Sequence, residues 1–126
     1  MPDRLLIVED CAPIATALAG HLSGAGYLTT IAPDGERALE IIARERPDCI
    51  LLDLMLPGIS GMDVLKHVRA DAATASVPIV LVSAQVATLE LGGDVDVDGA
   101  VGKPFTKAQL VAAVKTALSK RRQAAS

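Results

Sequence analysis

The chain has 126 residues, of which 51% are hydrophobic and only 2% aromatic, and its formal charge is −3. A single domain of this length can fold without disulfide or metal crosslinks, and its core must consist of Leu, Ile, Val and Ala, as is typical of a parallel sheet covered by helices. The negative charge disfavours binding to nucleic acid through the overall electrostatic field, so we expect a protein or a small ion as partner and no nucleic acid.

Two strand-and-helix units occupy the first third of the chain. The apolar run at residues 4–8 predicts a buried strand, and in the helix that follows apolar side chains recur at four-residue steps, at Ile14, Leu18 and Leu22. Residues 27–31 predict the second strand. The helix after this strand turns Leu39 and Ile42 inward.

The middle of the chain contains the third and fourth strands. Residues 48–53 and 77–83 are apolar runs of strand length. Between them, a helix over residues 61–70 places Leu65 and Val68 on one face. Both runs are largely apolar, which is typical of strands that are covered on both faces.

The pattern weakens after the fourth strand. Residues 85–91 hold at most two turns of helix before Gly92 and Gly93. We therefore expect residues 85–99 to be short, displaced or mobile in place of a full fourth helix. Residues 99–102 leave room for only a short fifth strand.

The last helix has the strongest start signal. Thr106 and Gln109 have the spacing of a capping box. The inner stripe of this helix consists of Leu110, Val114 and Leu118. We expect one domain over residues 1–120 and a frayed tail over residues 121–126.

Strands and helices that alternate in this way predict an α/β fold. Right-handed crossovers between parallel strands would produce one five-stranded, doubly wound sheet with helices on both faces and a weak or shortened fourth helix. In such a sheet, functional groups gather at the carboxyl ends of the strands, where the strand order reverses.

Polar residues follow nearly every one of the predicted strands. Glu9 and Asp10 follow the first strand, Asp53 ends the third, Ser83 ends the fourth and Lys103 follows the fifth. Two carboxylates about 4 Å apart repel each other by roughly 4 kcal/mol at an effective dielectric constant near 20, so three acids need more than one lysine to neutralise them. An all-oxygen set of ligands suits Mg²⁺, which also binds phosphate oxygens, so the strand ends predict a magnesium site for a phosphate group.

The motifs "VED", "DLMLPGISG", "SA" and "GKPF" in this order resemble the receiver domain of two-component response regulators. The resemblance runs from about Arg4 to Leu118 and implies a flavodoxin-like receiver fold. It further implies that Asp53 accepts a phosphoryl group from a sensor histidine kinase or a phosphotransfer protein. Ser83 would form a hydrogen bond with this phosphoryl group, and Lys103 would pair with it.

The resemblance also implies a Mg²⁺ cofactor. Glu9 and Asp10 would hold the ion, with Asp10 and Asp53 as direct carboxylate ligands and the backbone carbonyl of Met55 as a further ligand. Such a protein is a signalling phospho-acceptor and not an enzyme.

The expected role is that of a stand-alone signalling or phosphorelay protein with an unknown downstream protein target, because no effector domain follows the last helix. Cys11 and Cys49 have no partner at metal-ligand spacing, which favours free thiols in a reducing cytoplasm. No apolar window reaches membrane-spanning length, so we expect no membrane association. At the position three before the lysine, where receivers commonly carry an aromatic residue, this chain has Ala100, so an aromatic switch is not expected.

Several alternatives remain at this point. Glu9 and Asp10 would cap the first helix, Ser83 would only end a strand and Lys103 would be a solvated lysine if each stood alone. The sequence "DVDVDG" at residues 94–99 opens like a calcium-binding EF-hand loop, but its twelfth position is Phe105 and not Glu, which favours a solvated acidic connection.

Other classes of function lack their own signals. A nucleotide-binding protein would carry a Gly-rich turn after the first strand, and an aspartyl hydrolase would carry a second acid close behind Asp53; neither is present. The remaining alternative is a receiver-like protein-interaction module that works without phosphorylation, and Mg²⁺ binding and phosphodonor chemistry would separate it from a phospho-acceptor.

Overall fold

The computed structural model describes residues 2–54, 56–83, 97–103 and 105–125, without the side chains of Ser83 and residues 121–125. Its elements follow in the order β1 (Arg4–Val8), α1 (Ala12–Gly24), β2 (Leu28–Ala32), α2 (Gly35–Arg44), β3 (Cys49–Leu52), α3 (Gly61–Ala70), β4 (Ile79–Ser83), β5 (Gly99–Gly102) and α4 (Lys107–Ala125). All five predicted strands are therefore present, with bounds that differ by one or two residues at most.

The strands form a single parallel sheet in the order β2-β1-β3-β4-β5. This order confirms the predicted doubly wound, flavodoxin-like fold. After β1 the chain first adds β2 on one side and then β3 on the other, so the strand order reverses between β1 and β3. The carboxyl ends of these two strands are the place where such a sheet binds its ligands.

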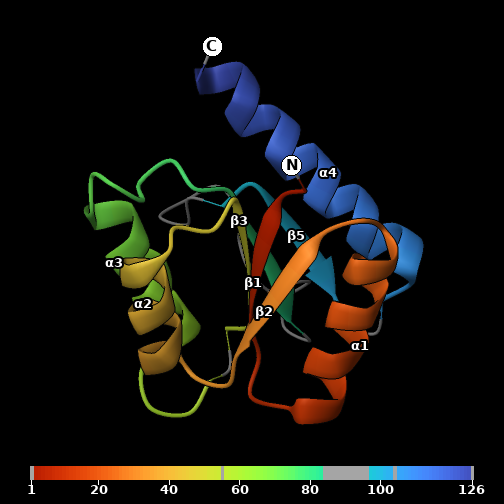
Figure 1. Cartoon of the computed structure of the whole chain (residues 1–126). Helices are drawn as coiled ribbons and strands as arrows, with labels where there is room; N and C mark the ends of the chain where they lie inside the picture. The colour runs from red at the N-terminus through yellow and green to blue at the C-terminus, as the bar shows by residue number, and fades with distance from the viewer. Residues whose placement is uncertain (1, 55, 84–96, 104, 126) are drawn as a thin grey trace.

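Helices cover both faces of the sheet, α2 and α3 on one face and α1 and α4 on the other (Figure 1). Each pair of helices closes its own apolar cluster against the strands. The predicted inner stripes are confirmed: the residues that face the sheet include Leu18, Leu22, Ile42, Leu65, Val68, Leu110, Val114 and Leu118. The thiol of Cys49 is buried in the core, as its place in the third strand predicted.

The capping box of α4 is also confirmed. The Gln109 N–H donates to Oγ1 of Thr106 over 3.1 Å, and the Thr106 N–H donates to Oε1 of Gln109 over 2.9 Å. The helix continues to Ala125, through most of the segment that was expected to be a frayed tail. None of the described helices has the length and the apolar composition needed to cross a membrane.

Two predictions for the segment before β5 have different outcomes. The weak helix expected at residues 85–91 lies outside the described residues, as do Asp94 and Asp96. The expected solvated acidic connection is wrong for Asp98, because its side chain is only 8% exposed and forms an ion pair with Arg69. Residues 99–102, which would belong to an EF-hand loop that starts at Asp94, form β5 of the parallel sheet.

Candidate functional site

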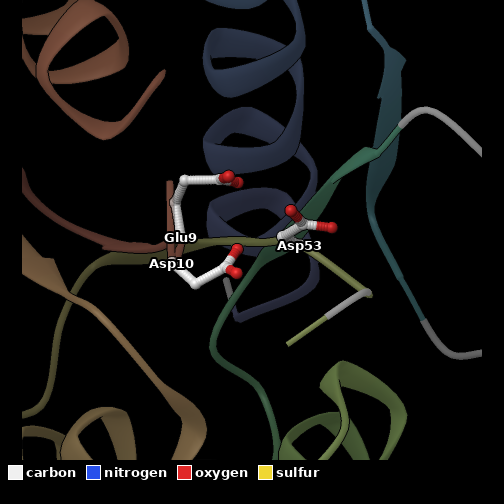
Figure 2. A group of neighbouring side chains, drawn as sticks. All are labelled: Glu9, Asp10 and Asp53. Atoms are coloured by element: carbon white, nitrogen blue, oxygen red, sulfur yellow. The ribbon is translucent and has the colours of Figure 1, made fainter. Parts of the chain in front are cut away.

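The acidic residues predicted to meet at the strand ends do so. The register pairs Val8 with Leu52, so Glu9 and Asp10 leave β1 next to the point where Asp53 leaves β3. The Asp53 N–H donates to the Val8 carbonyl over 3.1 Å, which fixes the backbone of Asp53 just beyond the paired residues. Figure 2 shows the three side chains on these two neighbouring strand ends.

The three carboxylates are crowded. One oxygen from each of Glu9, Asp10 and Asp53 lies within 4.8 Å of the other two. Glu9 is 2% and Asp53 5% exposed, whereas Asp10 is exposed to solvent. Two buried charges of the same sign repel each other in a poorly hydrated site, so this arrangement needs a cation.

Lys103 supplies part of the compensating charge. Its Nζ lies 3.0 Å from Oε2 of Glu9 and 3.0 Å from Oδ2 of Asp53, so one ammonium bridges the carboxylates that follow β1 and β3. The register of β5, which pairs Gly102 with Ser83, places Lys103 at the same edge of the sheet as the acids. The interpretation of Lys103 as a solvated surface lysine is therefore wrong.

The site changes the acidity of both partners. Burial, followed by the hydrogen bond to Asp53, raises the pKa of Glu9 to about 7, and the ammonium of Lys103 opposes this effect. Burial is the largest single effect on Lys103 and lowers its pKa, but the hydrogen bonds and charges of Asp53 and Glu9 together outweigh it and raise the pKa. Without a further cation, the cluster therefore holds a proton on Glu9 through part of the neutral pH range.

The donor set fits a hard divalent cation. Within the part of the chain that the structure describes, Glu9, Asp10 and Asp53 are the one group of three or more acids, cysteines or histidines close enough to share a metal ion. All of its donors are oxygens, as Mg²⁺ prefers. Glu9 and Asp53 each give one oxygen to the Lys103 ammonium, and the other oxygen of Glu9 accepts the Cys11 N–H over 3.4 Å.

The loop after β3 brings α3 close to Asp53. Gly61 begins α3, its N–H donates to the Leu54 carbonyl over 3.2 Å, and a Cβ at this position would overlap the carbonyl oxygen of Asp53. Gly58 has a φ of 72°, a backbone conformation that favours glycine, so the turn after Asp53 depends on this residue. Sequence reasoning missed the role of Gly61, because its neighbours on β3 become visible only in three dimensions.

The helices on this face also start with caps that sequence reasoning did not identify. Ser60 and Asp63 form a capping box at α3, and Asp34 caps α2 by accepting the Arg37 N–H over 2.8 Å. Both caps have local sequence signals, a Ser or Asp three residues before the residue whose N–H it accepts.

Two predicted site residues lie wholly or partly outside the described part of the structure. Met55 lies outside the described residues, so its backbone carbonyl is not placed. Ser83 ends β4 opposite Gly102, but its side chain is not described. Ala100 lies half-buried in β5 and packs against the cluster beneath α2 and α3.

The family model of the response regulator receiver domain matches residues 5–115. The chain belongs to this family. This match confirms the resemblance to receiver domains of two-component signalling that was inferred from the four motifs.

Similar proteins include both longer regulators and isolated receiver domains. The chain is 42% identical to the DNA-binding response regulator MtrA of Mycolicibacterium paratuberculosis over 94% of its own length and 52% of that protein, so it spans about half the length of this curated relative. A putative response regulator from Chloroflexus aurantiacus is 36% identical with a TM-score of 0.89, over 94% of this chain and 99% of that one. The receiver domain of the sensor histidine kinase PA1611 from Pseudomonas aeruginosa, whose structure has a magnesium ion in the active site cleft, is 28% identical with a TM-score of 0.84, over 94% and 99% of the two chains.

Proposed function

We propose that Asp53 accepts a phosphoryl group from a phosphohistidine of a sensor histidine kinase or a phosphotransfer protein. The observation that carries this proposal is the buried Asp53 carboxylate, held 3.0 Å from the Lys103 ammonium and beside two further acids. A structural carboxylate in an ion pair would not need the additional negative charges of Glu9 and Asp10. A site that receives a metal ion and an anionic group together does need them.

The transfer exchanges one bond to phosphorus for another. A carboxylate oxygen of Asp53 attacks the phosphorus, the bond from phosphorus to the donor imidazole nitrogen breaks, and that nitrogen takes up a proton. The product is an acyl phosphate on Asp53. Because attacking and transferred groups are both anionic, catalysis depends on positioning and charge neutralisation.

Lys103 contributes to this chemistry through its position. Its ammonium orients the Asp53 carboxylate before transfer and would pair with the phosphoryl oxygens afterwards. Ser83, at the end of β4, would donate a hydrogen bond to the same group. Both roles rest on the strand ends from which these residues emerge.

The metal ion in this proposal is Mg²⁺. Asp10 and Asp53 would bind it directly, Glu9 would lie close by, and the Met55 carbonyl would be a further ligand. When bound, the ion would supply positive charge that offsets the negative charge of the phosphoryl group and of the acids. The magnesium ion in the related PA1611 receiver domain supports this assignment.

The proposed role is signalling by phosphorylation, as a phosphorelay or regulatory protein in the cytoplasm, and not catalysis on a separate substrate. The two cysteines, which are free thiols, accord with a reducing compartment. The downstream target that we propose is a protein. MtrA, of which this chain covers about half, is a DNA-binding regulator, and DNA binding is no part of the function proposed for this chain.

Incubation with Mg²⁺ and acetyl phosphate, followed by intact-mass measurement, tests the proposal. The wild-type protein should gain the mass of one phosphoryl group, and Asp53→Asn should gain none. Asp48→Asn alters a carboxylate just before the start of β3, at the end of this strand away from Asp53, and should react like the wild type. Equal rates for Asp53→Asn and the wild type would disprove the assignment, and Mg²⁺ binding without any phosphorylation would favour a protein-interaction module.

A further inference from the structure

A second buried charge pair lies at the edge of the sheet opposite the acidic site. Nη2 of Arg69, near the end of α3, is 3.2 Å from Oδ2 of Asp98, the residue before β5. The two side chains are only 12% and 8% exposed. Removing two charges from water is costly, so the contacts of this pair need an explanation.

Asp98 is attached to the first residue of β4 by both its side chain and its backbone. Oδ2 of Asp98 accepts the Ile79 N–H over 2.8 Å, and the Asp98 N–H donates to the Ile79 carbonyl over 2.8 Å. These two bonds fix which residue of β4 lies opposite the start of β5.

Arg69 also binds the chain that leads into β4. Its Nη1 donates to the carbonyl of Ala75 over 2.9 Å and to that of Val77 over 2.5 Å. The guanidinium therefore joins three segments: the end of α3, the chain that leads into β4, and Asp98, which leads into β5. Both strands start from one anchored point.

β5 itself has few side chains that could determine its register. It has four residues, Gly99-Ala100-Val101-Gly102, of which only Val101 is buried. The two glycines have no side chains to pack, and strands of this kind specify their register weakly.

The register of β5 decides where Lys103 lies. With Gly99 opposite Val80 and Gly102 opposite Ser83, the next residue places its ammonium 3.0 Å from both Glu9 and Asp53. A slip of one residue would move Lys103 by about 3.3 Å along the sheet and reverse the direction of its side chain. Neither ion pair would survive such a slip.

We infer that the Arg69–Asp98 pair positions Lys103 for phosphoryl transfer by fixing the register of β5 from its far end. Arg69 and Asp98 are thus positioning residues, and they act through Lys103. The inference rests on the proposed function for its rate measurement, but its structural part is testable without phosphorylation.

The test uses Asp98→Asn, which keeps an acceptor for the Ile79 N–H and removes the charge that pairs with Arg69. Asp71→Asn is the matched control, because Asp71 is an exposed acid in the same α3–β4 connection and its side chain accepts only a local N–H, that of Ala73, among the bonds described for it. If Asp98→Asn does not fold, Arg69→Gln takes its place.

The first measurement is amide hydrogen exchange in the metal-free protein. Asp98→Asn should speed exchange at the β5 amides that bond to β4 by about tenfold, relative to Leu6 and Leu51 in the centre of the sheet, because a charge-assisted contact is lost. Asp71→Asn should leave the exchange rates in β5 unchanged relative to those in the centre of the sheet. Equal changes in β5 and in the centre of the sheet, or no change in β5, would overturn the inference.

The second measurement is a double-mutant cycle on the rate of phosphorylation by acetyl phosphate. Asp98→Asn should slow the reaction about tenfold when Lys103 is present and by less than about twofold in a Lys103→Ala background, because Asp98 affects the reaction through the position of Lys103. Mg²⁺ affinity should stay within about twofold, since the acids stand on β1 and β3. Equal rate losses in both backgrounds would contradict the inference. If the wild-type protein is not phosphorylated at all, the proposed function is contradicted, and the hydrogen-exchange measurement alone tests the role of the Arg69–Asp98 pair.

Discussion

The Lys103 ammonium lies 3.0 Å from Oδ2 of Asp53, although the two residues are 50 positions apart and follow strands that are not neighbours in the sheet. β4 lies between β3 and β5, so the long lysine side chain reaches across the end of β4 to Asp53. The same ammonium binds Glu9, and this places it where negative charge would accumulate during phosphoryl transfer.

Removing the ammonium should therefore affect both folding and reaction. In Lys103→Ala, two buried carboxylates lose their shared cation, so we expect the free energy of unfolding in metal-free buffer at pH 8 to fall by about 1–3 kcal/mol. Phosphorylation by acetyl phosphate should slow at least about tenfold, while Mg²⁺ still binds. Urea denaturation and intact-mass time courses measure the two effects. Lys107→Ala, which removes an exposed lysine at the start of α4, should change neither.

Asp10 should matter for the metal more than for the fold. Asp10→Asn removes one of three crowded carboxylates, which relieves repulsion and leaves stability in metal-free buffer equal or higher. The same change should weaken Mg²⁺ binding at least about tenfold, because it removes a charged ligand. Titration calorimetry checks the affinity. Unchanged Mg²⁺ affinity in this variant would exclude Asp10 as a ligand.

The buried Glu9 predicts a pH dependence of stability in metal-free buffer. Its pKa is about 7 in the folded protein, against an ordinary value of 4.5, so the folded state binds the proton more tightly than the unfolded state. The contribution of Glu9 to stability is therefore complete below pH 4.5 and declines as the pH rises to about 7, by up to about 3 kcal/mol.

Urea denaturation in EDTA at pH 5 and pH 8 measures this decline. Glu9→Gln carries no titratable group at this position, so the difference between the two pH values should shrink in that variant. A difference as large as that of the wild type would assign the pH dependence to another residue.

Much of the site was predictable because topology converts sequence position into spatial position. Once the apolar runs are taken as parallel strands, the residues after β1, β3 and β5 must meet at one edge, and Glu9, Asp53 and Lys103 do. The burial of the strands and the cap of α4 follow from local patterns, which sequence reasoning reads well.

The contacts that escaped prediction join residues without a local pattern. Asp98 binds Arg69 and Ile79, which precede it by 29 and 19 residues, so it looked like one member of an exposed acidic run. Gly61 resembled an ordinary residue at a helix start, since nothing in "GISG" shows that the backbone of β3 passes against it. Such contacts depend on how helices pack on the sheet, which periodicity does not specify.

Gly61 provides the last prediction, because it allows α3 to approach Asp53. A Cβ at this position would overlap the carbonyl oxygen of Asp53 and lie 2.6 Å from Cα of Leu54, and neither backbone atom can move without shifting the end of β3. Gly61→Ala should therefore lower the free energy of unfolding by about 1–3 kcal/mol and slow phosphorylation of Asp53 as its backbone is displaced. Gly20→Ala is the matched control: Gly20 lies inside α1 with nothing within 4 Å of a new Cβ, so this change should raise stability by about 0.5–1 kcal/mol and leave the rate unchanged. Urea denaturation and acetyl phosphate kinetics measure stability and reaction rate in both variants. A Gly61→Ala protein as stable and reactive as the wild type would show that α3 does not constrain Asp53.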